Sequence, residues 1–185
     1  QPIAGLPLTE VVRRITGPAG TSVTVTILDP ATGQTRDYTL VRRRITIRSV
    51  TWQQLPGTTV AHVRIASFSQ GVTEELKAAL NDAVHAQGLT GVVLDLRNNP
   101  GGLLDESIAT ASQFLKEGNV LLEKDAQENV IAVPVQQGGV AVDVPLAVLV
   151  NSGTASAAEI VAGAIQDASR ARLVGDVTFG TGTVL

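Results

Sequence analysis

The chain has 185 residues, of which 44% are hydrophobic, and a formal net charge of −3 at pH 7. This content suffices for one good core and a small second module, while the slightly acidic balance gives no general attraction to nucleic acid or to anionic membranes. No apolar run reaches the roughly 18 residues of a membrane span, and the absence of cysteine excludes disulfides, thiol catalysis and thiolate metal sites.

The first 44 residues predict a short helix followed by a hairpin. Apolar residues recur with helical spacing over Leu8–Ile15, and Gly17–Gly20 ends that pattern. Alternating β-branched residues predict strands at Ser22–Ile27 and Tyr38–Val41, joined by a turn rich in Pro and Gly. Because these elements are too few for a complete domain, residues 1–44 are interpreted as the end of a module that begins before this chain.

Residues 45–185 predict an alternation of strands and helices. The expected strands are Ile45–Val50, Val60–Ile65, Gly91–Leu96 and Leu146–Val150, the expected helices are Val72–Ala86, Leu103–Leu115 and Ser156–Ala168, and a β-rich insertion covers Val120–Val144. The last two of these strands are short and, apart from Asp95, apolar, and each precedes a helix. The pattern therefore predicts an α/β core with buried parallel strands.

Loops at the carboxyl ends of parallel strands line the crevice where ligands bind, so the loops after Leu96 and Val150 are candidates for a functional site. The first, Asn98–Gly102, ends in two glycines, which allow backbone to approach a substrate and leave the Gly102 N–H free to donate to an oxyanion. Ordinary turn chemistry explains the same Pro-Gly-Gly sequence.

The second loop, Ser152–Glu159, surrounds Ser156 with small residues at the start of a helix. Such a position exposes the hydroxyl and favours negative charge, as a nucleophile requires. Ser156 and Glu159 also match a capping box, in which the serine only satisfies a backbone N–H. The residues by themselves leave both interpretations open.

Three segments, taken together, resemble successive motifs of the carboxyl-terminal processing, or tail-specific, proteases. They are Asp95–Gly102, Gly153–Asp167 and Val174–Gly180, and they occur in the order of that family. Leu8–Gly20 is similar to the end of the family's PDZ domain, and Val63–Phe68 to the entry into its catalytic core. The resemblance implies a crotonase-like α/β protease core in residues 45–185, preceded by part of a PDZ domain in residues 1–44.

The resemblance also implies a set of site residues for a serine peptidase that uses a lysine base. Ser156 is the expected nucleophile, and the N–H groups of Gly102 and Ala157 are the expected oxyanion hole. Asp167 matches a family aspartate, although a surface carboxylate near the end of a helix explains it equally well. Thr181 stands where the family has its catalytic lysine.

The threonine at position 181 breaks the expected pair, because a hydroxyl with a pKa far above neutrality cannot take the proton of Ser156. The family glutamine that supports the lysine aligns with Leu185. Solvated or structural roles are expected for the other candidate bases, which are Lys77, Lys116, Lys124, His62 and His85. A base beyond Leu185 remains an alternative.

Two hypotheses of different classes follow. The first is a serine endopeptidase that cleaves unfolded or C-terminally exposed proteins near their C-termini, impaired at Thr181. The second is a non-catalytic peptide-binding scaffold with the same fold. The resemblance further implies a periplasmic or cell-envelope location and no metal or organic cofactor, and it leaves the oligomeric state open. No nucleic-acid partner and no transmembrane segment are expected in this chain.

Overall fold

The computed structural model of the chain describes residues 3, 5–43, 48–125 and 127–181. It divides into two compact units, residues 1–47 and 48–185. The boundary expected from the sequence, between residues 44 and 45, falls within the segment 44–47 and so lies outside the described residues.

The first unit consists of helix α1 (Leu8–Ile15) and an antiparallel hairpin of β1 (Ser22–Leu28) and β2 (Thr35–Val41). The predicted helix and hairpin are therefore confirmed. The residue that follows β2 fastens the helix to the hairpin, because Arg42 Nε donates to the carbonyl oxygen of Ile15 at 2.7 Å. Its Nη1 atom also donates to the hydroxyl of Thr21 at 2.9 Å.

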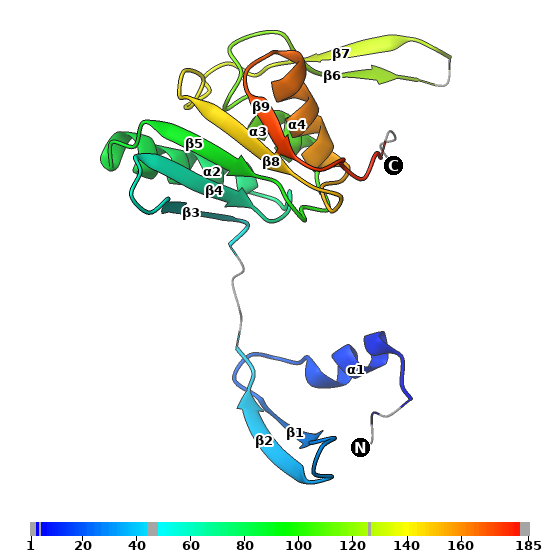
Figure 1. Cartoon of the computed structure of the whole chain (residues 1–185). Helices are drawn as coiled ribbons and strands as arrows, with labels where there is room; N and C mark the ends of the chain where they lie inside the picture. Colours follow the sequence, from blue (N-terminus) through cyan, green and yellow to red (C-terminus); the bar gives the residue numbers. More distant parts are fainter. Residues whose placement is uncertain (1–2, 4, 44–47, 126, 182–185) are drawn as a thin grey trace. The chain divides into compact units, whose positions relative to one another are not determined.

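The second unit is a five-stranded sheet with helices and a separate hairpin (Figure 1). Its elements are β3 (Val50–Gln54), β4 (Val60–Ile65), α2 (Val72–Leu80) continued by the π-helical segment η1 (Asn81–Ala86), β5 (Gly91–Asp95), α3 (Leu104–Ala111), β6 (Asn119–Lys124), β7 (Val130–Pro134), β8 (Leu146–Val150), α4 (Ala157–Asp167) and β9 (Arg172–Gly175). The strand order is β3-β4-β5-β8-β9. All neighbours in it are parallel except β3 and β4. The predicted α/β core with parallel strands is confirmed.

Three elements differ from the sequence-based expectation. The strand expected at Ile45–Val50 begins only at Val50, because pairing with β4 starts there, opposite Ile65; residues 45–47 lie outside the described residues. The helix expected to reach Leu115 ends at Ala111, after which Phe114 and Leu115 turn into the core. Strand β9 was not expected, because its four residues carry too short a pattern to be recognised.

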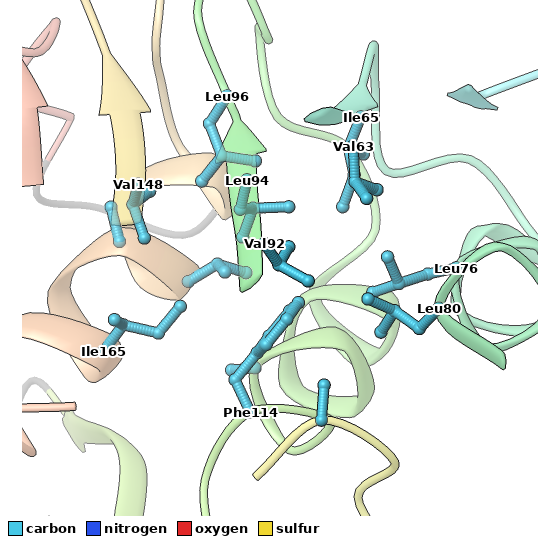
Figure 2. Packing of buried hydrophobic residues seen from close by; sticks show 14 of the residues in the cluster. Val63, Ile65, Leu76, Leu80, Val92, Leu94, Leu96, Phe114, Val148 and Ile165 are labelled. Atoms are coloured by element: carbon cyan, nitrogen blue, oxygen red, sulfur yellow. The ribbon is translucent and has the colours of Figure 1, made fainter. Parts of the chain in front are cut away.

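The core of this unit lies between the sheet and the helices that cover one of its faces. Figure 2 shows Val63, Leu94 and Val148 from adjacent strands pointing toward Leu76, Phe114 and Ile165. These side chains are buried, and Leu94 and Phe114 have no solvent-exposed surface. A close-packed core of this kind fixes strand ends rigidly. The loops that follow β5 and β8 are therefore held by well-fixed strands.

Candidate active site

The glycine turn and the serine loop leave adjacent strands at the same edge of the sheet. Strand β5 precedes the turn, β8 precedes the loop, and the two strands pair in parallel with Asp95 opposite Leu149. Hydrogen bonds then join the loops directly: Thr154 Oγ1 donates to the carbonyl oxygen of Leu96 at 2.8 Å, and Ala155 N–H donates to that of Asn99 at 3.0 Å. The structure thus brings together the two loops that the sequence singled out.

A pair of asparagines closes the outer side of this junction. Asn151 Oδ1 accepts hydrogen bonds from the N–H groups of Asn98 at 2.9 Å and Gly153 at 3.1 Å. Its Nδ2 atom donates to Asn98 Oδ1 at 3.0 Å. Asn98 itself adopts a left-handed backbone conformation, with φ of 57°, which asparagine tolerates better than most residues.

Both glycines of the turn are required by close backbone contacts. At Gly101, with φ of 96°, a Cβ atom would lie 2.8 Å from the Cβ of Ser156 and 2.9 Å from the nitrogen of Ala157. At Gly102, with φ of 146°, a Cβ atom would lie 2.3 Å from the carbonyl oxygen of Phe68. The turn therefore lies directly against the start of α4, with Gly101 touching Ser156.

Ser156 is the N-cap residue of α4 and has a strained backbone, with φ of 51° and ψ of −122°. Non-glycine residues in sparsely populated conformations cluster at functional sites. The capping-box arrangement with Glu159 is also present, and its Glu159 half is a hydrogen bond from Ser156 N–H to Glu159 Oε2 at 2.9 Å. The other half of a capping box would be a hydrogen bond to the Ser156 side chain. Among the described residues, that side chain makes no hydrogen bond that caps the helix.

Two backbone N–H groups beside Ser156 have no acceptor within the described part of the chain. They belong to Gly102 and Ala157, the residues expected to form an oxyanion hole. The neighbouring groups are paired: Gly101 N–H donates to Asn99 Oδ1, and Leu103 N–H donates to the carbonyl oxygen of Phe68. Gly102 is exposed, and Ala157 is the first residue of α4, so its N–H has no partner within the helix. Two unpaired donors next to one serine are therefore suited to an oxygen atom supplied from outside.

The carboxylate of Glu159 gathers the segment that follows β9 around the serine loop. Its Oε1 atom accepts hydrogen bonds from the hydroxyl of Thr178 at 2.8 Å and from Gly180 N–H at 2.7 Å. Its Oε2 atom accepts one from Thr181 N–H at 2.9 Å, in addition to the one from Ser156 N–H. Because these last two nitrogens share one acceptor atom, the backbone of Thr181 lies beside that of Ser156.

The same four donors determine the charge state of Glu159. Burial by itself would raise the pKa of this carboxyl, but the hydrogen bonds from Thr178, Gly180, Thr181 and Ser156 outweigh that effect and hold the pKa below its usual range. Glu159 is therefore an anion that anchors the loop. A carboxylate held in this way is a poor proton acceptor for Ser156.

A second buried carboxylate lies just before the glycine turn. The side chain of Asp95 is fully buried and accepts hydrogen bonds from Arg97 Nη2 at 2.7 Å, from Arg97 N–H at 3.0 Å and from His62 Nε2 at 2.9 Å. Burial would raise the pKa of Asp95, but the bonds from Arg97 and His62 prevail and hold it well below its usual range. The pairing gives His62 a structural partner.

The remaining candidates lie elsewhere. Asp167 is exposed and is the last residue of α4, so at about 1.5 Å per residue it lies some 16 Å along the helix from Ser156. The structure does not bring it to the site. The three lysines form ion pairs with surface carboxylates, which are Lys77–Glu74, Lys116–Asp143 and Lys124–Glu128. His85 is exposed, and Leu185 lies outside the described residues.

Sequence reasoning missed several residues of this site. Asn99, Asn151 and Asp95 were not singled out, and Glu159 was considered only as a partner in a capping box. The local pattern around the asparagines predicts a turn and nothing more. Within the described ranges, no group of three His, Asp or Glu side chains is placed to hold a metal ion.

Residues 59–185 match the family profile of Peptidase family S41. Over 185 aligned residues the chain is 42% identical to a carboxyl-terminal-processing protease of Synechocystis sp., covering 97% of this chain and 42% of that protein. It is 37% identical to a carboxy-terminal-processing protease of Bartonella bacilliformis, covering 98% of this chain and 42% of that protein. The chain thus spans less than half the length of these relatives.

Solved structures with the same fold include the photosystem II D1 C-terminal processing protease. That protein is 34% identical to this chain with a TM-score of 0.68, over 91% of this chain and 47% of the other. A putative peptidase from Parabacteroides merdae has a TM-score of 0.61 at 22% identity, over 74% and 45% of the two chains, and shows the shared fold alone.

Proposed function

The chain belongs to peptidase family S41, and from this premise we propose that it is the Ser156-bearing part of a serine endopeptidase that cleaves proteins at or near their C-termini. The observation that carries the proposal is the junction of the two loops. Gly101 touches Ser156, and the N–H groups of Gly102 and Ala157 on either side of that contact lack acceptors among the described residues. This arrangement suits acyl transfer.

The proposed reaction assigns a role to each of these groups. Ser156 Oγ loses its proton to a base and forms a bond to the carbonyl carbon of the substrate, whose oxygen becomes an anion. The N–H groups of Gly102 and Ala157 donate to that oxyanion. The C–N bond then breaks, the amine leaves with a proton, and water hydrolyses the acyl-serine. Each oxyanion donor in such a site accounts for about 10²–10³ in kcat.

This reaction needs a base that accepts the proton of Ser156, and the chain has no lysine at the expected position. Thr181 stands at the position of the family lysine, and its hydroxyl cannot accept the proton of Ser156 at neutral pH. Its backbone nevertheless lies beside Ser156, because Glu159 Oε2 binds both N–H groups. We therefore propose that the chain with Thr181 has low activity and that a lysine at this position would be placed to act. No role is proposed for Asp167.

The proposal also covers the substrate of the peptidase and its location in the cell. The relatives are named as carboxyl-terminal processing proteases, which supports a protein substrate that is cut near its C-terminus. We propose that this C-terminal segment enters the site unfolded or exposed. The family resemblance supports a periplasmic or cell-envelope setting. In the described part of the chain no helix has the length and hydrophobicity to span a membrane. Neither the proposed chemistry nor its residues call for a cofactor.

A peptide-binding scaffold without catalysis is the second candidate, and Thr181 is the observation that favours it. Labelling of Ser156 by a fluorophosphonate in the full-length Thr181→Lys variant separates the two candidates, because a catalytic site reacts once its base is restored and a scaffold does not. Cleavage of a fluorescent casein by the full-length protein gives the quantitative measure. Thr181→Lys should raise cleavage by about 10²–10⁴-fold, the usual contribution of general-base catalysis.

Two matched controls sharpen this experiment. Thr181→Arg adds the same charge but cannot lose its proton, so it should not raise cleavage. Thr181→Lys combined with Ser156→Ala should be inactive. Brisk cleavage by the unaltered full-length protein, with no gain from lysine, would show that another residue supplies the base and that the interpretation of position 181 is wrong.

A further inference from the structure

Asn99 is a fully buried polar residue at the centre of the loop junction. Its side chain has no solvent-exposed surface, and both ends of its amide are paired. Nδ2 donates to the carbonyl oxygen of Ile65 at 2.9 Å, and Oδ1 accepts from Gly101 N–H at 2.9 Å. Buried amides without such partners are costly, so the side chain is strongly held in this orientation.

The backbone of Asn99 makes the third connection. Its carbonyl oxygen accepts a hydrogen bond from Ala155 N–H at 3.0 Å. A single residue therefore ties together three segments: the end of β4 at Ile65, the glycine turn at Gly101, and the serine loop at Ala155. These three attachment points lie immediately around the proposed oxyanion donors, since Gly101 precedes Gly102, and Ala155 lies two residues before Ala157.

The other side of the turn is held by backbone alone. Phe68 N–H donates to the carbonyl oxygen of Gly101 at 2.9 Å, and Leu103 N–H donates to that of Phe68 at 2.8 Å. These two bonds flank Gly102 and leave its own N–H unpaired within the described residues. Phe68 thus fixes one side of the turn, the Asn99 side chain fixes Gly101 to the end of β4, and the Asn99 carbonyl oxygen joins the turn to the serine loop.

We propose that Asn99 is a positioning residue that sets the separation of the Gly102 and Ala157 N–H groups. The proposal rests on the proposed function, because it concerns the oxyanion hole of that reaction. Asn99 touches no substrate atom and acts through the backbone of Gly101 and Ala155. Its role requires a donor and an acceptor on one short, planar group, which asparagine provides and aspartate, serine and leucine do not.

A peptide boronic acid tests this role without needing a base. Boron bonds to the serine oxygen, and one oxygen of the tetrahedral adduct occupies the oxyanion position. We would measure the Kd of the full-length protein for Ala-Ala-boroalanine and, separately, for the matching tripeptide amide, which forms no adduct. Asn99→Ala and Asn99→Asp should each weaken boronate binding about 10–100-fold, on the scale of one oxyanion donor, with less than about a twofold change for the amide.

Ser112→Ala is the matched control for loss of buried hydrogen bonds. The hydroxyl of Ser112 is also fully buried, donates to the carbonyl oxygen of Ile108 at 2.7 Å and accepts from Gln136 N–H at 3.0 Å, beyond the end of α3. It should lower thermal stability without changing the ratio of the two affinities. That ratio separates a positioning role from a structural one.

The outcomes are distinct. A folded Asn99 variant that binds the boronate within about twofold of the unaltered protein would overturn the positioning role. The role would also be overturned if none of Asn99→Ala, Asn99→Asp and Asn99→Ser folds, because Asn99 would then act in stability. If Ser156→Ala binds the boronate as tightly as the unaltered protein, no adduct forms at Ser156. That result would reject the proposed function itself.

Discussion

The two units of the chain differ in how they are stabilised. In the part of the chain that the structure describes, every buried hydrophobic residue lies in the unit of residues 48–185. In the unit of residues 1–47, large apolar side chains such as Leu28 and Leu40 are more than half exposed. The helix and hairpin there are connected by the hydrogen bonds of Arg42 instead. Loops with demanding geometry are found where a packed core holds the strands that precede them.

This comparison predicts the largest effect for a core truncation in the second unit. Phe114 has no exposed surface and packs among residues from the sheet and helices. Phe114→Ala should lower the free energy of unfolding by about 3–5 kcal/mol, because it leaves a cavity that the core cannot fully close. Urea unfolding followed by circular dichroism measures it. A loss below about 1 kcal/mol would mean that this core does not stabilise the unit.

The next effect concerns the glycine turn. Gly102→Ala would place a Cβ atom 2.3 Å from a backbone oxygen that cannot move away, so it should cost about 2–4 kcal/mol and, in the Thr181→Lys background, abolish labelling of Ser156. Gly57→Ala is the matched control. Gly57 has φ of 72° but no atom within 4 Å of an added Cβ, so it should cost only about 1 kcal/mol and leave labelling intact. Equal losses in both variants would contradict the importance of close contact.

A smaller, pH-dependent effect distinguishes the carboxylates of the two units. The pKa of Asp95 lies well below its usual range when folded, whereas the unfolded carboxyl titrates near its ordinary value of about 3.9. The ionised form therefore stabilises the fold fully above that value, and this contribution is lost as the pH falls toward the folded pKa. Asp95→Asn should cost on the order of 2 kcal/mol at pH 7 and progressively less below pH 4.

Glu10 provides the contrast for that measurement. Hydrogen bonds from Arg13, and then Arg14, lower the pKa of Glu10 to about 2. These bonds lie on the surface of α1 and are open to solvent. Glu10→Gln should therefore leave the acid unfolding of the second unit unchanged. A parallel shift in both variants would indicate that the acid transition reports something other than the Asp95 cluster.

The smallest effect is expected at the surface of the first unit. Leu40 is 52% exposed, so Leu40→Ser should change the free energy of unfolding by less than about 0.5 kcal/mol. The measurement is urea unfolding of the same protein used for Phe114→Ala. A loss above about 1 kcal/mol would break the comparison, because it would show that this side chain is covered in solution.

The sequence by itself determined the framework of the site. Hydrophobic patterns predicted the strands before the two loops, the glycines predicted close backbone approach at Gly101 and Gly102, and the small residues around Ser156 placed it at a helix start. These features are local, because each depends on residues adjacent along the chain. The order of the motifs added the family, and with it the significance of Thr181.

Only the tertiary structure decided what holds the framework together. Asn99 reaches Ile65, 34 residues away, and Asn98 reaches Asn151, 53 residues away. Glu159 was expected to cap its own helix, but it also binds the backbone of Gly180 and Thr181. No local pattern distinguishes an asparagine that forms a turn from one that joins three segments. The partner of a buried polar group is chosen by which strands lie side by side, and that choice belongs to the fold as a whole.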